Sequence, residues 1–286
     1  MTDQNDLKQT QFEATFGALA TLWNQAAMDR RLDMLVEWYW AEKRAASPNP
    51  LVKAGQKYFS QSDEDGITLE ILRRIGGSPG TFVEFGAGNG LENNTLILLM
   101  NNWKGVWFGA EDLRISLPDD NSKLKFSKTW ITAENCVAIM SRGLDHLGTS
   151  SFDFLSIDLD GNDLYVADAI IRSGARPSVI VVEYNAKFPP PIKWSIKYDP
   201  QHRWTGIGDD YQGASLQAFI DLFADAGYRL VGCNVTGTNA FFVARELENK
   251  FSDVPDDAAT LFYPADYNWF VRRGHGTSPK TIERFL

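Results

Sequence analysis

The sequence has little of what marks a secreted or membrane-bound protein. Its N-terminus, residues 1–6, is polar and acidic and lacks the basic and apolar segments of a signal peptide. No apolar stretch approaches the roughly 20 residues that a membrane-spanning helix needs. The 2 cysteines, Cys136 and Cys233, lie far apart without metal-ligand spacing, which indicates buried free thiols in a reducing compartment. These absences predict a cytoplasmic protein with no membrane partner.

Positive charge is also in short supply. The 286 residues include 28 lysines and arginines against 37 aspartates and glutamates, a formal net charge of −9. An acidic surface disfavours nucleic acids and anionic membranes as the main partner, because both repel negative charge. The composition is otherwise globular, with 44% hydrophobic residues and ample length for a full core. We therefore expect a small-molecule partner and no nucleic acid.

One glycine-rich stretch, Thr81–Gly90, organises the chain. Its apolar run ends in an acid, Glu84, and Gly86, Gly88 and Gly90 follow at every second position. A helix-like apolar run comes shortly after. Glycine lets the backbone turn tightly and approach a ligand without a Cβ in between. A strand that turns through glycines into a helix is how open α/β sheets hold a nucleotide-like ligand.

Strands and helices alternate from this stretch to about residue 250. Such alternation predicts a mostly parallel sheet with helices on both faces. The last two strands are joined by a short turn, 235–238, and should pair as an antiparallel hairpin at one edge. The expected fold class is therefore α/β, a Rossmann-like sheet of seven strands whose last strand is antiparallel. The expected strands are 81–85, 104–110, 125–132, 152–158, 178–184, 228–234 and 239–245, and the expected helices are 93–101, 134–147, 162–173 and 214–226.

Three segments lie outside this alternation and set the expected boundaries of the α/β domain at 55–250. Residues 1–54 show helical spacing of apolar side chains, which predicts an N-terminal helical cap. The aromatic cluster Trp38-Tyr39-Trp40 within it also suits a lid or the surface of a homodimer. Residues 186–213 form a long loop rich in aromatics, which is typical of functional loops. Residues 251–286 are expected to pack back on the domain as an extension.

The glycine stretch departs from the dinucleotide fingerprint G-x-G-x-x-G, because the sixth position counted from Gly86 is Leu91. The pattern that stands there, E-x-G-x-G-x-G from Glu84 to Gly90, resembles the first motif of class I S-adenosylmethionine-dependent methyltransferases. Further segments look like the FkbM-type branch of that superfamily, so that the resemblance covers roughly residues 55–250. They are Ser60-Gln61, Glu64-Asp65-Gly66, Phe82 to Thr95, Gly105-Val-Trp107, Ser156 to Gly161, Gly213 to Leu216 and Asn239 to Val243.

The resemblance implies S-adenosylmethionine as the methyl donor, and the residues around the glycines suit that ligand. Backbone N–H groups of the glycine loop can bind its carboxylate, and Glu84 can receive its amino group. A ribose diol suits a bidentate carboxylate, which Glu111 or Asp112 offers after the second strand. The family's acid usually falls earlier, where this chain has Gly109, so the choice between the two stays open. The expected cofactor-binding residues are Glu84, Gly86, Ala87, Gly88, Gly90, Asn94, Glu111, Asp112, Asp158 and, near the adenine, Thr132 and Glu134, the last being alternatively a helix-start acid.

A second group of polar residues follows the fourth and fifth strands, whose carboxyl ends should face one crevice. Asp158, Glu183 and Asn185 resemble the ligand set of metal-dependent O-methyltransferases, and their oxygens suit Mg²⁺. Alternatively, Asp158 and Asp160, which alternation puts on one side of an extended chain, bind acceptor hydroxyls or serve as the general base. A third interpretation is a plain turn with a helix cap. The sequence leaves all three open.

The long loop adds His202 to Asp158 and Asp160 as a candidate base. Its mixture of aromatic, basic and hydroxyl side chains suits a sugar-like or polyol acceptor, and the Asn239 amide is placed to orient it. These features together predict methyl transfer from S-adenosylmethionine to an oxygen of a small or carbohydrate-like molecule, assisted in one interpretation by a divalent metal. Two alternatives are an NAD-dependent oxidoreductase, against which Leu91 argues, and a non-catalytic S-adenosylmethionine-binding protein.

Overall fold

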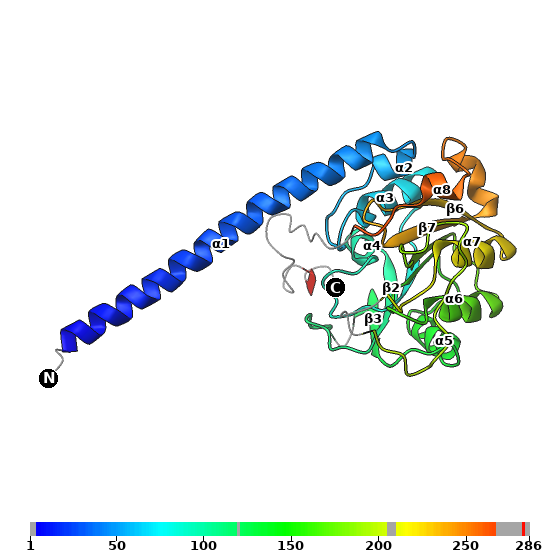
Figure 1. The fold of residues 1–286 in the computed structure, drawn as a ribbon. Coiled ribbons are helices and arrows are strands. Elements are labelled where there is room, and N and C mark those ends of the chain that lie inside the picture. The colour runs from blue at the N-terminus through cyan, green and yellow to red at the C-terminus, as the bar shows by residue number, and fades with distance from the viewer. Residues whose placement is uncertain (1–3, 119–120, 205–209, 267–281, 284–286) are drawn as a thin grey trace.

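The computed structural model describes residues 4–118, 121–204, 210–266 and 282–283, with side chains described for residue 15 and from residue 17 on (Figure 1). A seven-stranded sheet in the order β3-β2-β1-β4-β5-β7-β6 forms its centre. All neighbouring strands are parallel except at β7, which pairs antiparallel with both β5 and β6. The predicted fold class is therefore confirmed. The strands are β1 (Thr81–Phe85), β2 (Lys104–Gly109), β3 (Leu124–Lys128), β4 (Phe154–Ile157), β5 (Val179–Glu183), β6 (Tyr228–Cys233) and β7 (Asn239–Ala244).

Helices cover both faces of this sheet, and their predicted positions are confirmed to within a few residues. The helices α5, α6 and α7 lie side by side on one face, and α2, α3 and α4 lie on the other (Figure 1). No helix in the described part of the chain is both long and apolar enough to cross a membrane. The helices are α1 (Gln4–Ala46), α2 (Pro50–Lys53), α3 (Glu64–Ile75), α4 (Leu96–Met100), α5 (Cys136–His146), α6 (Asp163–Arg172), α7 (Leu216–Asp225), α8 (Ala258–Leu261) and the 3-10 helix η1 (Arg245–Phe251).

The central strands carry the core. Because helices cover both faces, β4 and β7 are buried at every position, and they read as continuous apolar runs rather than as alternating ones. Full burial of each large apolar side chain contributes roughly 1.5–3 kcal/mol. Both cysteines, Cys136 and Cys233, are buried free thiols, as predicted. The rigid sheet fixes the positions of the loops that follow β1, β2, β4 and β5 at its carboxyl edge.

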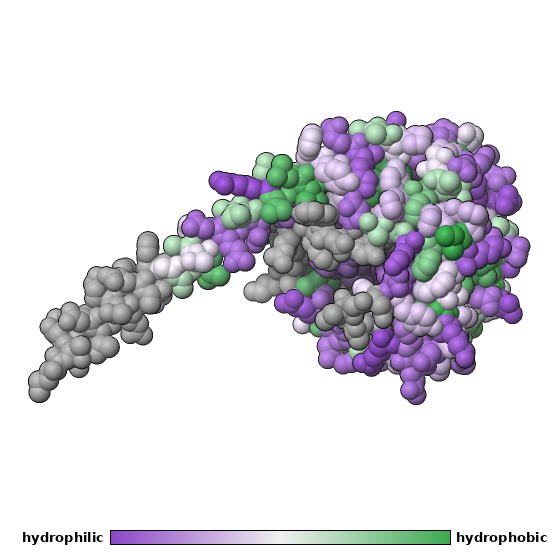
Figure 2. All heavy atoms as spheres, in the orientation of Figure 1, coloured by the Kyte–Doolittle hydropathy of each residue, from purple (hydrophilic) through white to green (hydrophobic). Residues whose placement is uncertain are grey.

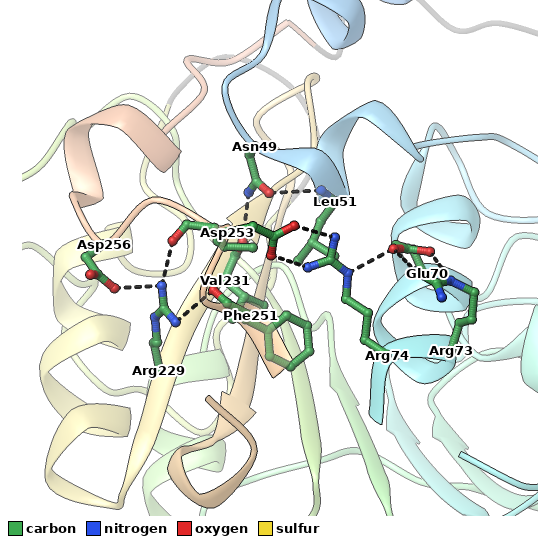
Figure 3. Close-up of polar contacts among 11 residues, drawn as sticks. Asn49, Leu51, Glu70, Arg73, Arg74, Arg229, Val231, Phe251, Asp253 and Asp256 are labelled. Carbon is green, nitrogen blue, oxygen red and sulfur yellow. Dashed lines mark hydrogen bonds and ion pairs between the residues drawn. The ribbon is translucent and has the colours of Figure 1, made fainter. Parts of the chain in front are cut away.

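Polar contacts fasten the two terminal segments to the α/β domain (Figure 3). The Asn49 side chain accepts from the N–H of Leu51, which caps α2, and donates to the Val231 carbonyl on the edge strand β6. Arg74 on α3 binds Asp253 of the C-terminal segment at 2.6 Å. These contacts hold residues 49–51 against β6 and Asp253 against α3. Arg229 on β6 adds further bonds to the carbonyls of Phe251 and Val254 and to Asp256.

The expected N-terminal cap over 1–54 differs from what the structure shows. The helix itself is confirmed and ends before Pro48, as the sequence indicates. However, α1 projects away from the domain along most of its length (Figure 1). Among the described side chains of α1, those of the last turns pack on the body through Val36 and Trp40, whereas the large apolar ones N-terminal to Val36 are exposed. In the C-terminal extension, Tyr263 packs against the core, whereas Tyr267, Trp269 and Phe270 lie outside the described residues.

Candidate functional site

A cleft opens at the carboxyl ends of the parallel strands, where ligands bind in sheets of this kind. It has two connected arms, with volumes of about 350 Å³ and 250 Å³. Five residues line both arms and mark the point where the arms meet: Gly86, Gly88, Glu111, Asp158 and Asp160. We call the larger one the first arm and the smaller one the second arm. The first arm is also lined by Trp130, Ile131, Asn162, His202, Arg203 and Trp204, and the second by Gln61, Glu84, Asn89, Glu92, Asn93, Asn94 and Glu183.

The glycine loop needs its glycines for different reasons. A Cβ on Gly86, whose φ is 98°, would lie 1.6 Å from the carbonyl oxygen of Asp158, so β1 and β4 can converge only at a glycine. Gly88 has a φ of 48° and nothing within 4 Å of an added Cβ, because it faces the open cleft. The N–H groups of Gly86 and Ala87 both donate to the Phe108 carbonyl. The N–H of Gly90 donates to the Ala87 carbonyl, so the expected carboxylate-binding amides reduce to those of Gly88 and Asn89, which have no acceptor among the described residues.

Glu84 lies at the base of the second arm and is 2% exposed. Its carboxylate accepts from the Asn94 N–H at 3.0 Å, from the Thr95 hydroxyl at 2.5 Å and from the Asn93 amide at 3.3 Å. Burial raises the pKa of Glu84 to about 7, and these hydrogen bonds oppose the rise only in part. The group is thus a buried acid whose hydrogen-bonding partners are all uncharged, at the edge of a cavity.

The two acids after β2 have different surroundings. Glu111 lines both arms of the cleft. Asp112 lines neither arm, and its carboxylate forms an ion pair with Lys128 at 2.7 Å on the open surface. Of the two candidates that the sequence left open, only Glu111 is therefore placed where it can meet a ligand in the cleft.

The expected adenine-binding residues lie one turn beyond the cleft wall. Thr132 and Glu134 line neither arm, and Glu134 instead accepts a hydrogen bond of 2.5 Å from the Tyr198 hydroxyl, which lowers its pKa. The wall itself is made by Trp130 and its neighbours. The Arg203 guanidinium lies 4.5 Å from the centre of the Trp130 ring, so the long loop and the turn after β3 close this side together.

Three carboxylates converge where the arms meet. Asp158, Asp160 and Glu183 each offer an oxygen within 4.8 Å of the others. Burial raises the pKa values of Asp158 and Glu183 well above those of ordinary acids, and repulsion between the carboxylates adds to this. Because the two carboxyl groups of Asp158 and Glu183 lie this close, a proton on one of them would replace their repulsion by a hydrogen bond. Burial and the charge of Glu111 likewise raise the pKa of Asp160.

The turn after β4 is held by a different acid. The buried Asp163 accepts from the N–H groups of Leu159 at 2.7 Å and Gly161 at 2.8 Å, and burial raises its pKa to about 6. Asp160 stands in the left-handed region with a φ of 54°, so the chain is not extended there as the alternation argument assumed. The turn interpretation therefore fits Asp163, while Asp158 and Asp160 still face the cleft.

Two predicted amides, those of Asn185 and Asn239, line neither arm of the cleft. The Asn185 side chain donates to the carbonyls of Asp210 and Gln212 and accepts from the N–H of Lys187. It is thereby tied to the long loop, and it lines neither arm of the cleft. Asn239 is buried, pairs with Glu183 across β5 and β7, and donates weakly to Glu64 at 3.3 Å.

His202 reaches the cleft, but in the first arm only. Its ring lies over Gly161, where an added Cβ would come within 2.5 Å of it. The Nε2 atom of His202 and the Oδ1 atom of Asn162 are both buried and have no hydrogen-bond partner among the described residues. Asn162 is otherwise fixed by its Nδ2, which donates to the Asp199 carbonyl at 2.8 Å. Two buried polar atoms on this side of the cavity therefore lack a hydrogen-bond partner among the described residues.

Several residues that line the cleft were not predicted from the sequence as ligand-binding candidates. Trp130 was placed inside an expected strand over 125–132, whereas β3 ends at Lys128 and the tryptophan follows in the turn. Asn93 begins the expected helix over 93–101 and Glu92 precedes it, although both line the second arm. Gln61 precedes the first strand by many residues, so only its membership in the family-like Ser60-Gln61 pair marked it.

Comparison with known proteins gives no family model and no curated protein that matches this sequence. Matching solved structures include the methyltransferase domain of bacterial CtHen1-C, with 12% identity over 63% of this chain and 96% of that chain and a TM-score of 0.38. An O-methyltransferase family protein from Burkholderia thailandensis matches with 10% identity over 74% and 70%, at a TM-score of 0.36. The glycopeptide N-methyltransferase MtfA in complex with S-adenosyl-L-homocysteine matches with 14% identity over 68% and 95%, at 0.34. Likeness at this level carries no argument about activity.

Proposed function

We propose that this chain is an S-adenosylmethionine-dependent methyltransferase that acts on an oxygen of a small, carbohydrate-like acceptor. The observation that carries the proposal is the open side of the glycine loop. Gly88 presents bare backbone to a cavity at the carboxyl ends of the strands, and acids that range from the buried Glu84 to the exposed Glu111 surround that cavity. A ligand that contains both a positively charged group and a nucleoside fits both features.

The first arm suits the nucleoside. Trp130 and Ile131 offer flat and apolar contacts, and the unpartnered Asn162 Oδ1 can accept from an exocyclic amino group. Glu111 can accept from both ribose hydroxyls, because a carboxylate offers two oxygens to a vicinal diol. This assignment gives His202 a role in closing the nucleoside arm rather than in proton transfer, since it does not line the second arm.

The second arm begins with Glu84, whose raised pKa reflects a buried carboxylate without a cation. An ammonium group placed beside it would supply that cation and favour the ionised form. The free amides near Gly88 can donate to a carboxylate at the same end of the ligand. S-adenosylmethionine supplies both groups and an electrophilic methyl on a positively charged sulfur.

The second arm also restricts the acceptor. Its lining contains the carboxyl groups of Glu84, Glu92, Glu111, Asp158, Asp160 and Glu183, several carboxamides, and no lysine, arginine or histidine among the described residues. A phosphate or carboxylate on the acceptor would meet these acids and no cationic side chain among the described lining residues. Hydroxyl groups can donate to these oxygens, and an amine can pair with them. We therefore expect a neutral polyol or an amine-bearing sugar as the acceptor, and no anionic one.

Methyl transfer to oxygen asks the protein to align the two reactants, exclude water and take up one proton. Asp158 and Asp160 line both arms, and burial raises their pKa values, which makes them stronger proton acceptors than ordinary carboxylates. The Gly86 backbone contact fixes Asp158 relative to the glycine loop, so the proposed base and the donor site are part of one rigid unit.

A divalent cation, Mg²⁺ in the first instance, is the second part of the proposal. Asp158, Asp160 and Glu183 provide three carboxylate oxygens within 4.8 Å, a donor set that suits a hard cation. A cation there would replace a proton on one of these acids and relieve the repulsion that raises their pKa values. It would also lower the pKa of a bound hydroxyl group. In this proposed set of metal ligands, Asp160 replaces Asn185, which the sequence had suggested.

Calorimetry with S-adenosylmethionine and S-adenosylhomocysteine tests the donor half of the proposal. We expect measurable binding by the wild-type chain and none by Gly88→Val, whose side chain would project into the cavity. The matched control is Gly148→Val, because Gly148 also has a positive φ (72°) and nothing within 4 Å of an added Cβ, but lies in the turn after α5. Folded wild-type protein that binds neither compound would refute the proposal, and equal loss in both variants would refute the loop assignment.

A further inference from the structure

Most of α1 stands apart from the rest of the molecule (Figure 1). The helix has 43 residues and is therefore about 65 Å long at 1.5 Å per residue. Its described contacts with the body come from the last turns, where Val36 and Trp40 pack on Val52 and Val235. N-terminal to Val36, every described large apolar side chain of α1 is exposed.

These side chains are numerous and large. Of the 13 exposed large hydrophobic residues in the described part of the chain, 9 are on α1. Figure 2 shows apolar side chains on α1 near the point where it leaves the body. Trp23 is 78% exposed and Leu35 is 65% exposed, which is far from what a solvated helix in a monomer presents. A surface of this kind indicates that a partner covers it.

One row of these residues has the spacing of a helix-to-helix seam. Met28, Leu32, Leu35 and Tyr39 follow at intervals of four, three and four residues, which places them on one side of the helix. At about 100° per residue, this row lies roughly a quarter turn from the side that Val36 turns toward the body. The row is therefore accessible while α1 stays anchored in its observed position.

The two charges that flank the row fit a second copy of the same helix. At about 100° per residue, Asp29 and Arg31 lie on opposite sides of the row, each roughly a quarter turn from it, and they carry opposite charges. When two copies of the helix pair in parallel through the row, the Arg31 side of each copy faces the Asp29 side of the other, so the flanks attract. A helix that lies on an anionic membrane would instead need a basic polar face, which α1 lacks.

We propose that α1 pairs with α1 of a second copy of this chain through the row Met28, Leu32, Leu35 and Tyr39. The resulting homodimer buries the seam and leaves the cleft of each copy on its own body. This inference rests on the helix alone, and it holds or fails independently of the proposed methyl transfer.

The test is the molar mass of the full chain in solution, measured by size exclusion with light scattering between about 1 and 100 μM protein. The wild type should show twice the chain mass of 32.1 kDa. Leu35→Glu should reduce the mass to that of one chain, because it places a charge in the seam. Met34→Glu is the matched control, since Met34 is the adjacent residue, is 73% exposed and lies off the row; it should leave the dimer intact.

Three outcomes would overturn the proposal. One is a wild type that is monomeric over the whole concentration range. The second is equal dissociation by Leu35→Glu and Met34→Glu with unchanged circular dichroism, which would assign the contact to another face. The third is a monomeric wild type that sediments with phosphatidylcholine–phosphatidylserine vesicles, which would make the partner of α1 a lipid surface.

Discussion

Glu84 allows the electrostatics of the cleft to be tested by one isosteric change, Glu84→Gln. The side chain is buried among neutral hydrogen-bond donors, and its pKa is raised by burial from 4.5 to about 7. Between these two pH values the folded protein keeps a proton on Glu84 that the unfolded chain has released. Stability must therefore fall as pH rises from about 4.5 to 7, because the folded state binds more protons in that window.

The size of this effect follows from the difference in pKa. A change of one pKa unit corresponds to about 1.4 kcal/mol, so the full difference of roughly 2.5 units amounts to about 3 kcal/mol. Glutamine keeps the shape of the side chain and does not titrate. It can still accept from the Asn94 N–H, and its amide can donate to the Thr95 hydroxyl oxygen, so that the lost contact is the long one from Asn93 at 3.3 Å. The variant should thus fold, and its stability should lack the contribution of this one proton.

Urea unfolding of wild type and Glu84→Gln between about pH 5 and pH 8 measures the difference. We expect the stability of the variant to fall less steeply with pH, by up to about 1.4 kcal/mol per pH unit. Some slope should remain, because burial also raises the pKa of Asp63 to about 7 and that of Asp65 to about 6. Asp112→Asn, which changes an exposed acid on the same edge of the sheet, is the control. Parallel curves for wild type and Glu84→Gln would refute the reasoning.

The same variant bears on ligand binding. If Glu84 receives the amino group of S-adenosylmethionine, the wild-type affinity should rise as pH passes through about 7, because the carboxylate must be ionised to pair with it. Glu84→Gln should bind at least about tenfold more weakly, a loss of roughly 1.4 kcal/mol, and should lack this rise. An affinity that rises with pH equally in both proteins would assign the pH dependence to another group.

The remaining predictions concern the acids after β4. With a hydroxyl acceptor that supports turnover, EDTA should lower the rate and Mg²⁺ should restore it, and Asp160→Asn should remove the restoration; a rate that EDTA leaves unchanged would exclude the cation. Mg²⁺ should also raise the unfolding temperature more at high pH than at low pH, because protons compete with it for Asp158 and Glu183. Asp163→Ala should destabilise the fold by about 1–3 kcal/mol for each of two N–H groups left without an acceptor, measurable by urea unfolding.

The sheet could be predicted closely from the sequence because its signals are local. Apolar runs bounded by glycine, proline and polar residues mark each strand, and the short turn at 235–238 requires an antiparallel pair. The glycine loop could also be predicted from the sequence, because the close approach of Gly86 to the Asp158 carbonyl requires a glycine at that position. The direction of a side chain beyond the end of a strand could not be predicted, as Asn185 illustrates. Its amide binds carbonyls 25 and 27 residues further along the chain, and no local pattern reveals that contact.

The N-terminal helix shows a second kind of limit. Its periodicity predicts a helix, and the structure confirms one. The same apolar spacing would serve a cap on the body, a lid or a contact between two copies, because periodicity defines the apolar sides of a helix and not the surface that covers them. These outcomes are distinguished by where the helix lies in the fold. Among the described residues of α1, the side that carries Val36 and Trp40 contacts the body.

The charges in the cleft bear on the choice between the two cofactor classes that the sequence left open. A dinucleotide places the two negative charges of its pyrophosphate against the glycine loop. In this chain the glycine loop faces Glu84, Glu111, Asp158 and Asp160, and Arg203 is the basic residue among the described lining, stacked on Trp130 in the first arm. A pyrophosphate at Gly88 would therefore meet negative charge at close range, whereas a sulfonium and an ammonium group would neutralise it. Both Leu91 and the acids around Gly88 thus disfavour a dinucleotide. Leu91 does so because it replaces a glycine of the fingerprint, and the acids do so because they would repel the pyrophosphate.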